Sequence, residues 1–447
     1  MKASQVHESL AKHLPVGSEP IVVDLENSQG PYLRDALTGK DYIDFFTYFA
    51  SAPIGHNHPK MHDSNFVEKL LAVALTKPSS SDFYTVQMAE FVETFARIAM
   101  PKGMEHLFLI SGGALAVENA LKVAFDWKVR KNFERIAKQG GKAGMQPVDG
   151  LGSKIIHFRE AFHGRSGYTM SLTNTDDVRK YMYFPKFNWP RVLNPKLRFP
   201  VDDNVLADVE RAESIAIAQI ESAVRQFPGD IAGLIIEPIQ GEGGDNHFRP
   251  EFFKELRRLA DEHEFLLIAD EIQSGMGITG KMWAIEHMGV EADIIVFGKK
   301  AQVCGLIAGP RIDEVEGHVF AEESRINSTF GGDLTDMTRS TRFLEIIQED
   351  DLVAHTAQMG EKMLAGLRSL AETSKGVVSN VRGRGMMIAF DLPDKVQRDA
   401  TIDRMKQNGV YALKSGERSI RFRGMLDLPE EIIEKSLAVV EKSLPAA

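Results

Sequence analysis

The feature that most constrains this chain is an alternation of short apolar runs with amphipathic helical patterns through its middle. Helical spacing of apolar residues marks 116–138 and 250–264, and the second stretch begins with Pro250, a residue favoured at the first helical position. Strands that alternate with helices form a largely parallel sheet covered on both faces, so the sequence predicts an α/β fold. The apolar runs are HLFLIS (106–111), KIIHF (154–158), IAGLIIEPI (231–239), FLLIADEI (265–272) and DIIVFG (293–298).

The two ends of the chain differ from this middle part. Residues 1–60 carry turn signals such as NSQGPY and LTGKDY, which indicate a short meander. From about residue 335 a long helical pattern leads to VRGRGMMIAFDL (381–392) and to the strand-like SIRFRG (419–424). We therefore expect a large α/β domain over 61–333 and a smaller α+β domain built from 1–60 and 334–447.

Composition limits the kinds of partner and the cellular compartment that we expect for this chain. A net charge of −10 argues against nucleic acid, because a phosphate backbone needs a basic face. The single cysteine, Cys304, rules out an intramolecular disulfide and is expected to act as a small hydrophobe. No apolar run approaches the length of a membrane span, and GHNHP (55–59) is an isolated H-x-H without further ligands. We expect a cytoplasmic protein without membrane contact or a bound metal.

Two loops that follow predicted strands contain groups suited to anions. In ISGGALAVENALK (110–122) small residues open a helix, so its backbone N–H groups suit a phosphate, although a tight turn that binds nothing fits equally well. In AFHGRSGYTMSLTN (161–174) Arg165 suits a carboxylate, because a guanidinium can bond both oxygens. A solvated arginine is the alternative. Loops after parallel strands face the ligand crevice of open α/β sheets.

Charged side chains end three further predicted strands. In EPIQGEGGD (237–245), Glu237 and Glu242 suit acid–base work or a cation, and they could equally keep the turn soluble. Asp270 ends the strand FLLIA, where a buried carboxylate must be paired or hydrogen-bonded. Lys299 and Lys300 end the next strand. A lysine in such a crevice becomes nucleophilic when desolvation lowers its pKa, and two surface lysines are the alternative.

GMGITG (275–280) satisfies the G-x-G-x-x-G pattern of dinucleotide-binding loops. Such a loop needs its first glycine at the immediate end of a strand, whereas DEIQS separates the apolar run from Gly275. An acid follows at Glu291 or Asp293, but Asp293 begins the next strand instead of ending it. We therefore interpret the match as a coincidence of spacing and GMGITG as a turn, and an NAD(P)-dependent oxidoreductase stays the alternative from a different class of enzyme.

A phosphate cradle, an aspartate at one strand end and a lysine at its neighbour are together what pyridoxal phosphate needs. Its phosphate must be held, its aldehyde must form a Schiff base, and its pyridine nitrogen must stay protonated. These motifs form an ordered series along the chain together with GHNHP, NSTFGGD (327–333) and IRFRG (420–424). In this series the chain resembles the class III pyridoxal-phosphate-dependent aminotransferases, or ω-aminotransferases, over almost its whole length. The resemblance implies the pyridoxal-phosphate transferase fold of type I, with the cofactor in the large domain.

The resemblance also implies roles around the ring of pyridoxal 5'-phosphate. Lys299 would form the Schiff base, since the family's lysine directly follows the glycine at the strand end, and Lys300 would be only its neighbour. Asp270 would pair with the pyridinium nitrogen. Gln273 would reach the ring hydroxyl, and Phe162 would stack on the ring.

The phosphate and the subunit arrangement follow in the same way. Gly113 and Ala114 would give backbone N–H groups to the phosphate. The family builds its active sites across a homodimer interface, so Thr329 would reach the phosphate of the partner subunit.

Within the family, the chain most resembles the lysine 6-aminotransferases, through SGGALAVENALK, SLTNT followed by FPKFNWPR, EGGDNHFRPEFF and GKKAQVCG. This implies transfer of the ε-amino group of L-lysine to 2-oxoglutarate, giving 2-aminoadipate 6-semialdehyde and L-glutamate. Ornithine, 4-aminobutyrate and diaminobutyrate are the alternative donors. A mutase with the same cofactor and a non-catalytic scaffold are further alternatives.

One pocket must then accept two different substrates. The resemblance implies that Arg165 binds the far carboxylate of either substrate and that Arg421 binds the near carboxylate of 2-oxoglutarate. While lysine is bound, Arg421 would be a costly unpaired charge, so Glu242 is expected to pair with it in one half-reaction and release it in the other. Asn327 would help to hold the carboxylate of lysine.

Overall fold

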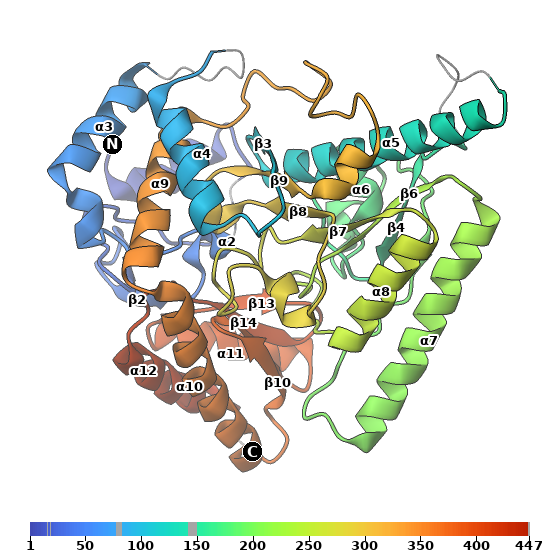
Figure 1. The fold of residues 1–447 in the computed structure, drawn as a ribbon. Coiled ribbons are helices and arrows are strands. Elements are labelled where there is room, and N and C mark those ends of the chain that lie inside the picture. The colour runs from blue at the N-terminus through green and yellow to red at the C-terminus, as the bar shows by residue number, and fades with distance from the viewer. Residues whose placement is uncertain (16, 18, 77–82, 142–149, 446–447) are drawn as a thin grey trace.

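The computed structural model describes residues 1–15, 17, 19–76, 83–141 and 150–445, and these residues form sheets of seven, four and three strands (Figure 1). In the seven-stranded sheet the order is β3-β9-β8-β7-β6-β4-β5. Only β9 runs antiparallel to its neighbours among these strands, so the prediction of a largely parallel sheet is confirmed. The strands are β3 (His106–Ile110), β4 (Lys154–Phe158), β5 (Arg191–Val192), β6 (Ile231–Ile236), β7 (Leu266–Asp270), β8 (Ile294–Phe297) and β9 (Cys304–Ala308).

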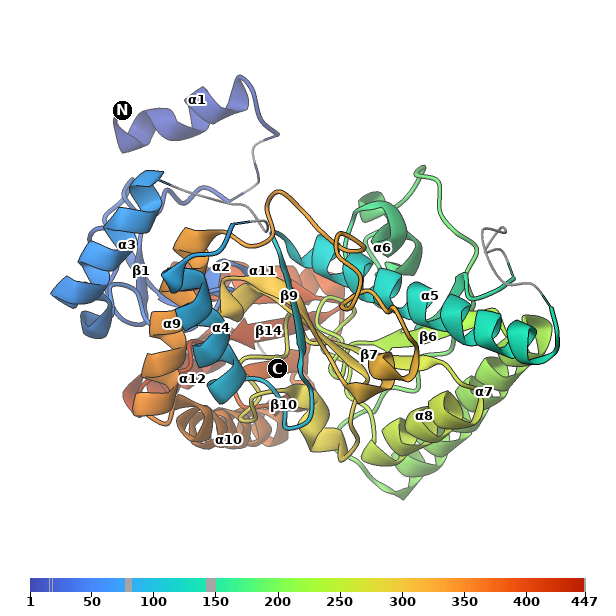
Figure 2. The same ribbon diagram turned by 45° about the horizontal axis from the view of Figure 1, so that its top comes forward.

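Helices cover both faces of this sheet, because successive strand residues point to opposite sides. Leu234 and Leu267 pack in one apolar cluster with α7 and α8, whereas Ile235 and Ile268 pack in another with α5. Figures 1 and 2 show the sheet between these two layers. The helices of this part are α3 (Ser64–Thr76), α4 (Val86–Ile98), α5 (Gly113–Lys138), α6 (Gly167–Leu172), α7 (Asp203–Gln226) and α8 (Pro250–Glu262).

The two chain ends meet in the smaller sheets. In the three-stranded sheet, β12 (Val410–Tyr411) pairs with β2 (Asp41–Asp44), which in turn pairs with β1 (Tyr32–Arg34). The four-stranded sheet has the order β10-β11-β14-β13, with bounds Ser379–Arg384, Met387–Asp391, Ser419–Arg423 and Leu413–Ser415. The helices of the two chain ends are α1 (Val6–Ala11), α2 (Thr47–Ala50), α9 (Leu334–Glu349), α10 (Leu352–Thr373), α11 (Lys395–Gln407) and α12 (Glu430–Ser443). Among the described helices, none combines the length and the apolar character that a membrane crossing requires.

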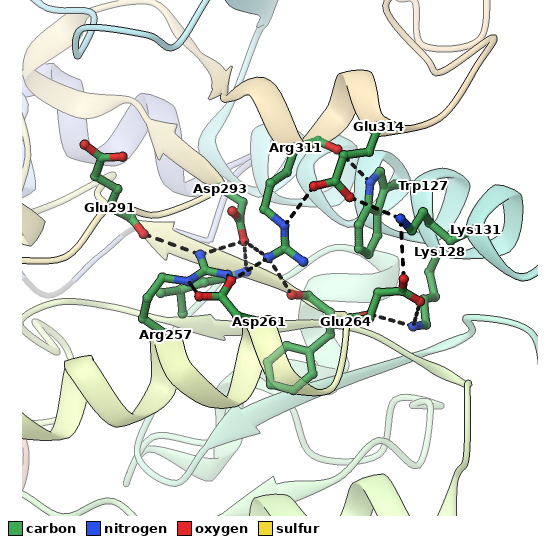
Figure 3. A network of polar contacts seen from close by, with 12 residues as sticks. Trp127, Lys128, Lys131, Arg257, Asp261, Glu264, Glu291, Asp293, Arg311 and Glu314 are labelled. Carbon is green, nitrogen blue, oxygen red and sulfur yellow. Dashed lines mark hydrogen bonds and ion pairs between the residues drawn. The ribbon is translucent and has the colours of Figure 1, made fainter.

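GMGITG forms a turn, as predicted, and the alternative dinucleotide interpretation is wrong. Residues 272–283 form turns and bends that lead to the short 3-10 helix η4 (Ala284–Met288), so no α-helix begins at these glycines to face a pyrophosphate. The Asp293 carboxylate accepts hydrogen bonds from the Leu267 N–H and from Arg257 and Arg311, at 2.7, 2.9 and 3.1 Å (Figure 3). Asp293 therefore holds the edge of the sheet where the parallel strands begin, opposite to the edge where ligands bind.

Candidate active site

The carboxyl ends of the large-sheet strands gather most of the residues singled out from the sequence. The segments after β3, β4, β6, β7 and β8 carry the glycine-rich turn, the FHGR loop, Glu242, Gln273 and Lys299, respectively. From the four-stranded sheet, β14 adds Arg421 at the same place, where its side chain bonds Glu242. The site therefore lies where the large sheet meets the small one.

The turn after β3 is built to receive an anion. Gly112 has φ +104° and is the N-cap of the 26-residue helix α5, so the N-cap offers no side-chain acceptor, and the first N–H groups of this helix have none among the described residues. The FHGR loop packs directly on this turn, because a Cβ at Gly164 would lie 2.7 Å from the Cβ of Ala114. The N–H groups and the helix dipole at Gly113 and Ala114 suit a phosphate.

Asp270 is the buried last residue of β7, and its carboxylate has a partner that the sequence analysis missed. Asp270 Oδ2 lies 2.7 Å from His163 Nδ1, and Oδ1 accepts a hydrogen bond from the Ile272 N–H at 3.2 Å. His163 is fully buried, and its Nε2 has no partner among the described residues. The histidine fixes the orientation of the carboxylate.

Glu237 positions the loops on either side. Its carboxylate accepts hydrogen bonds from the backbone N–H groups of Phe162 at 2.9 Å and Gly241 at 3.0 Å. Burial raises the pKa of Glu237 to about 7. Glu237 therefore holds the two loops in place. Glu242 is the carboxylate of this segment that contacts cationic side chains.

The two adjacent lysines have different surroundings. Lys300 Nζ donates to the backbone oxygens of Ala52 at 2.7 Å and Gly424 at 3.1 Å, so it ties three segments together. Nothing in the described chain accepts a hydrogen bond from Lys299 Nζ, and Lys299 adopts a positive φ of 48°. Such strain is typical of functional positions. Burial, with the nearby guanidinium of Arg421, lowers the pKa of Lys299 to about 8. The geometry favours Lys299 as the reactive amine.

A left-handed turn of non-glycine residues lies beside this lysine pair. Residues Thr47–Ala50, within α2, have φ of 45°, 51°, 58° and 70°. The turn is held by Asp44, whose Oδ1 accepts hydrogen bonds from the N–H groups of Phe46 and Thr47, and by the Thr47 hydroxyl, which donates to the Arg423 carbonyl at 2.8 Å. Asp44 also contacts His56 of the GHNHP motif at 3.1 Å, which gives that motif a structural role.

Gln273 is held with one end of its amide exposed to the site. Its Oε1 accepts hydrogen bonds from Arg423 Nε at 2.9 Å and Nη2 at 2.8 Å, and its Nε2 keeps its hydrogens free of acceptors among the described residues. A Cβ at Gly241 would lie 2.3 Å from this amide, so a larger residue there would displace the amide from its position. The free amide donor suits a ring hydroxyl.

Glu242 lies between two cations. Its Oε2 accepts a hydrogen bond from Arg421 Nη2 at 2.8 Å, and its Oε1 pairs with Lys180, a residue that the sequence analysis did not single out. Although burial raises the pKa of Glu242, Arg421 and Lys180 hold it below its ordinary value. Arg421 is almost fully buried, and its Nε and Nη1 lack partners among the described residues. Two nitrogens of this guanidinium can therefore donate hydrogen bonds to the carboxylate of a ligand.

The remaining predicted residues lie at the rim. Phe162 is half-buried, and Lys180 Nζ lies 5.7 Å from the centre of its ring. Arg165, Asn327 and Thr329 are exposed. The backbone oxygen of Phe330 accepts a hydrogen bond from the Ser111 N–H at 3.1 Å, which places the segment with Asn327 and Thr329 next to the glycine-rich turn.

These residues fit pyridoxal 5'-phosphate. The uncapped start of α5 would hold the phosphate, Asp270 the ring nitrogen and Gln273 the ring hydroxyl, while Lys299 would offer an amine. The unpaired donors of Arg421 would receive a substrate carboxylate.

The comparisons with known proteins identify the family of the chain. The family model "Aminotransferase class-III" matches residues 13–444. The "L-lysine-epsilon aminotransferase" of Mycobacterium tuberculosis is 48% identical over 442 residues, covering 99% of this chain and 95% of that protein. The enzyme of that name from Amycolatopsis lactamdurans is 47% identical, with 99% and 96% covered. The structure "Lysine aminotransferase from M. tuberculosis in the internal aldimine form" superposes with a TM-score of 0.94 at 46% identity, covering 100% of this chain and 99% of the other. The chain therefore belongs to the class-III aminotransferases, and its cofactor is pyridoxal 5'-phosphate.

Proposed function

We propose that this enzyme transfers the ε-amino group of L-lysine to 2-oxoglutarate, giving 2-aminoadipate 6-semialdehyde and L-glutamate. The observation that carries the proposal is the buried Arg421, which bonds Glu242 through one nitrogen and keeps two donors unpaired among the described residues. A site that alternates between lysine and a dicarboxylate needs such a cation, which can be covered or presented. The names and the full-length identity of the relatives support lysine as the donor.

Lys299 would carry the proton transfers. With a pKa of about 8, roughly a quarter of the Lys299 amine is neutral at pH 7.5, against about one part in a thousand for an ordinary lysine. When bound, pyridoxal 5'-phosphate supplies an electrophilic carbon and a ring that accepts the electron pair of the broken C–H bond. The Lys299 amine would take the proton from the ε-carbon of lysine, while Asp270, oriented by His163, keeps a proton at the ring nitrogen.

The charged residues around the reacting centre would sort the substrates. Arg165, at the rim, would bind the far carboxylate of either substrate, and Asn327 would assist with lysine. In the lysine half-reaction Glu242 covers Arg421, so the uncharged methylene chain meets no unpaired guanidinium. In the second half-reaction Arg421 leaves Glu242 and binds the near carboxylate of 2-oxoglutarate.

A screen of half-reactions tests this proposal. The holoenzyme is mixed with L-lysine, L-ornithine or 4-aminobutyrate, the bound cofactor is followed by absorbance, and the carbonyl product is identified by mass spectrometry. We expect the highest kcat/KM for L-lysine, and the Lys299→Ala variant serves as the inactive control. A faster reaction with ornithine or 4-aminobutyrate would refute lysine as the donor.

We also propose that two copies form a homodimer in which Thr329 reaches the phosphate of the partner subunit. Exposed apolar side chains near the rim support a partner there, since Phe330 is 54% exposed and Leu115, on the first turn of α5, is 40% exposed. Mixing Lys299→Ala with Thr329→Ala subunits should restore roughly a quarter of the wild-type sites, because half of the randomly formed dimers contain one intact site. A mixture no more active than its two parents would exclude shared sites.

The division into a large domain (61–333) and a small domain (1–60 with 334–447) is likewise a proposal. It is supported by an apolar cluster that combines Ile43 and Phe45 with Met387 and Phe422. Limited proteolysis should release fragments that end near residues 60 and 333, and cuts confined to other positions would contradict the division.

A further inference from the structure

Lys180 reaches the site from a segment that otherwise lies on the surface. The segment 176–186 connects α6 to β5, and its residues Tyr183 and Phe184 are 92% and 54% exposed. Lys180 instead turns inward, with its side chain 21% exposed and its ammonium group paired with Glu242. The segment thus supplies a second cation to the carboxylate that covers Arg421.

The two cations divide the carboxylate between them. Lys180 takes Oε1 of Glu242, and Arg421 Nη2 donates to Oε2. A guanidinium and a carboxylate form two parallel hydrogen bonds when both oxygens are available. With Lys180 on one oxygen and Arg421 on the other, Arg421 is held by a single bond, and its Nε and Nη1 stay unpaired among the described residues.

We propose that Lys180 is a specificity-determining residue that keeps the Arg421–Glu242 pair easy to open. Lys180 limits this pair to one hydrogen bond, and it retains Glu242 when Arg421 turns to a dicarboxylate. The inference rests on the proposed function of the pair, which is to cover Arg421 in one half-reaction and release it in the other.

The energetic reason lies in what would happen to Glu242 without Lys180. An opened Glu242 would be a partly buried carboxylate without a cation hydrogen-bonded to it, and such a group is costly. A closed Glu242 could offer both oxygens to Arg421 and form the stronger, two-bonded pair. Both effects favour the closed state, so the loss of Lys180 should weaken the binding of dicarboxylates and spare lysine.

The Lys180→Met variant tests this with a ligand that does not react. The dissociation constant of glutarate for the holoenzyme is measured by titration calorimetry, and the half-reactions with L-glutamate and L-lysine are followed separately. We expect glutarate to bind about tenfold more weakly and the KM for L-glutamate to rise about as much, as for the loss of one charge-assisted contact. The L-lysine half-reaction should change by less than about threefold.

Two further single variants separate this role from support of the loop. Lys180→Arg keeps the cation and should restore glutarate binding to within about threefold of the wild type. Lys186→Met is the matched control, because Lys186 lies in the same segment and donates to the backbone oxygens of Tyr181 at 2.6 Å and Phe184 at 2.8 Å. It should leave glutarate binding unchanged.

A double variant decides whether Lys180 acts through Glu242. In a Glu242→Gln background, Lys180→Met should have no further effect on glutarate binding, because Arg421 is then always released. A further loss in that background would mean direct contact between Lys180 and the ligand and would overturn the proposal. The proposal would also be overturned by an unchanged dissociation constant of glutarate in the Lys180→Met single variant. An equal loss of glutarate binding in Lys186→Met would overturn it as well. Failure of the wild type to convert L-lysine would refute only the donor, since glutarate and L-glutamate do not depend on it.

Discussion

Replacing Glu242 with glutamine should separate the two half-reactions. The glutamine keeps the shape of the side chain and removes the charge that covers Arg421. The Arg421 side chain is 4% exposed and that of Glu242 is 26% exposed, so the pair is only partly screened by water. In the lysine half-reaction the variant leaves a buried guanidinium beside an uncharged methylene chain, whereas in the glutamate half-reaction Arg421 has the substrate carboxylate as its partner.

The size of the effect follows from the geometry of the pair. Two unit charges about 4 Å apart interact by about 4 kcal/mol at an effective dielectric constant near 20. Glu242 is partly exposed and shared with Lys180, so about half of this value, ~2 kcal/mol, is expected to act on Arg421. This free energy corresponds to a loss of about 30-fold in kcat/KM for L-lysine, while the value for L-glutamate should stay within about threefold.

Single-turnover absorbance measurements with each amine provide the assay. Glu417, exposed in the turn between β13 and β14, offers a matched control as Glu417→Gln, which should leave both half-reactions unchanged. Equal losses with L-lysine and L-glutamate in Glu242→Gln would refute the idea that Glu242 covers Arg421 for one substrate only.

Three further predictions concern the cofactor. Lys299→Ala should abolish the absorption band of the cofactor bound to the enzyme's own lysine, while Lys300→Ala keeps this band, because Lys300 is tied to backbone oxygens. Absorption spectra of the two purified variants test this, and the reverse pattern would contradict Lys299 as the Schiff-base lysine. The rate at which the apoenzyme binds pyridoxal 5'-phosphate covalently should rise with pH and level off above about pH 8, since the lowered pKa of Lys299 makes its amine neutral there. A rate that still rises steeply past pH 9, as for lysine in a short peptide, would show that Lys299 has an ordinary pKa. Gly164→Ala should weaken cofactor binding by about tenfold or more, because its Cβ would meet Ala114 at 2.7 Å at a positive φ. Gly103→Ala, also at a positive φ but with no atom within 4 Å, is the control in a fluorescence titration, and equal effects would attribute the loss to backbone strain alone.

The sequence predicts the fold well where apolar runs end in polar residues. The runs at 154–158 and 265–272 contain β4 and β7, because strands buried on both faces leave a continuous apolar signature. Asp270 and Lys299 could be singled out for the same reason, since each directly follows such a run.

The contacts that orient these residues could not be predicted in this way. His163 is 107 residues from Asp270, and Lys180 is 62 residues from Glu242, so no local pattern records either pair. Lys180 stands in a polar stretch, DDVRKYMY, that resembles any solvated loop. The four positive φ angles at Thr47–Ala50 also contradict local preference, because the turn depends on the distant Arg423 carbonyl as well as on the nearby Asp44 carboxylate.

That left-handed turn has a consequence for the order of events during synthesis. The Thr47 hydroxyl bonds the Arg423 carbonyl, 376 residues away. At roughly 5–20 residues per second, about 20–75 s separate the emergence of the two groups from the ribosome. A left-handed backbone costs about 1–2 kcal/mol per residue, so the turn should not persist before its anchors exist. The segment beside the reactive lysine is therefore completed only when translation is nearly over, and a chain stalled before β14 should not acquire a working catalytic centre.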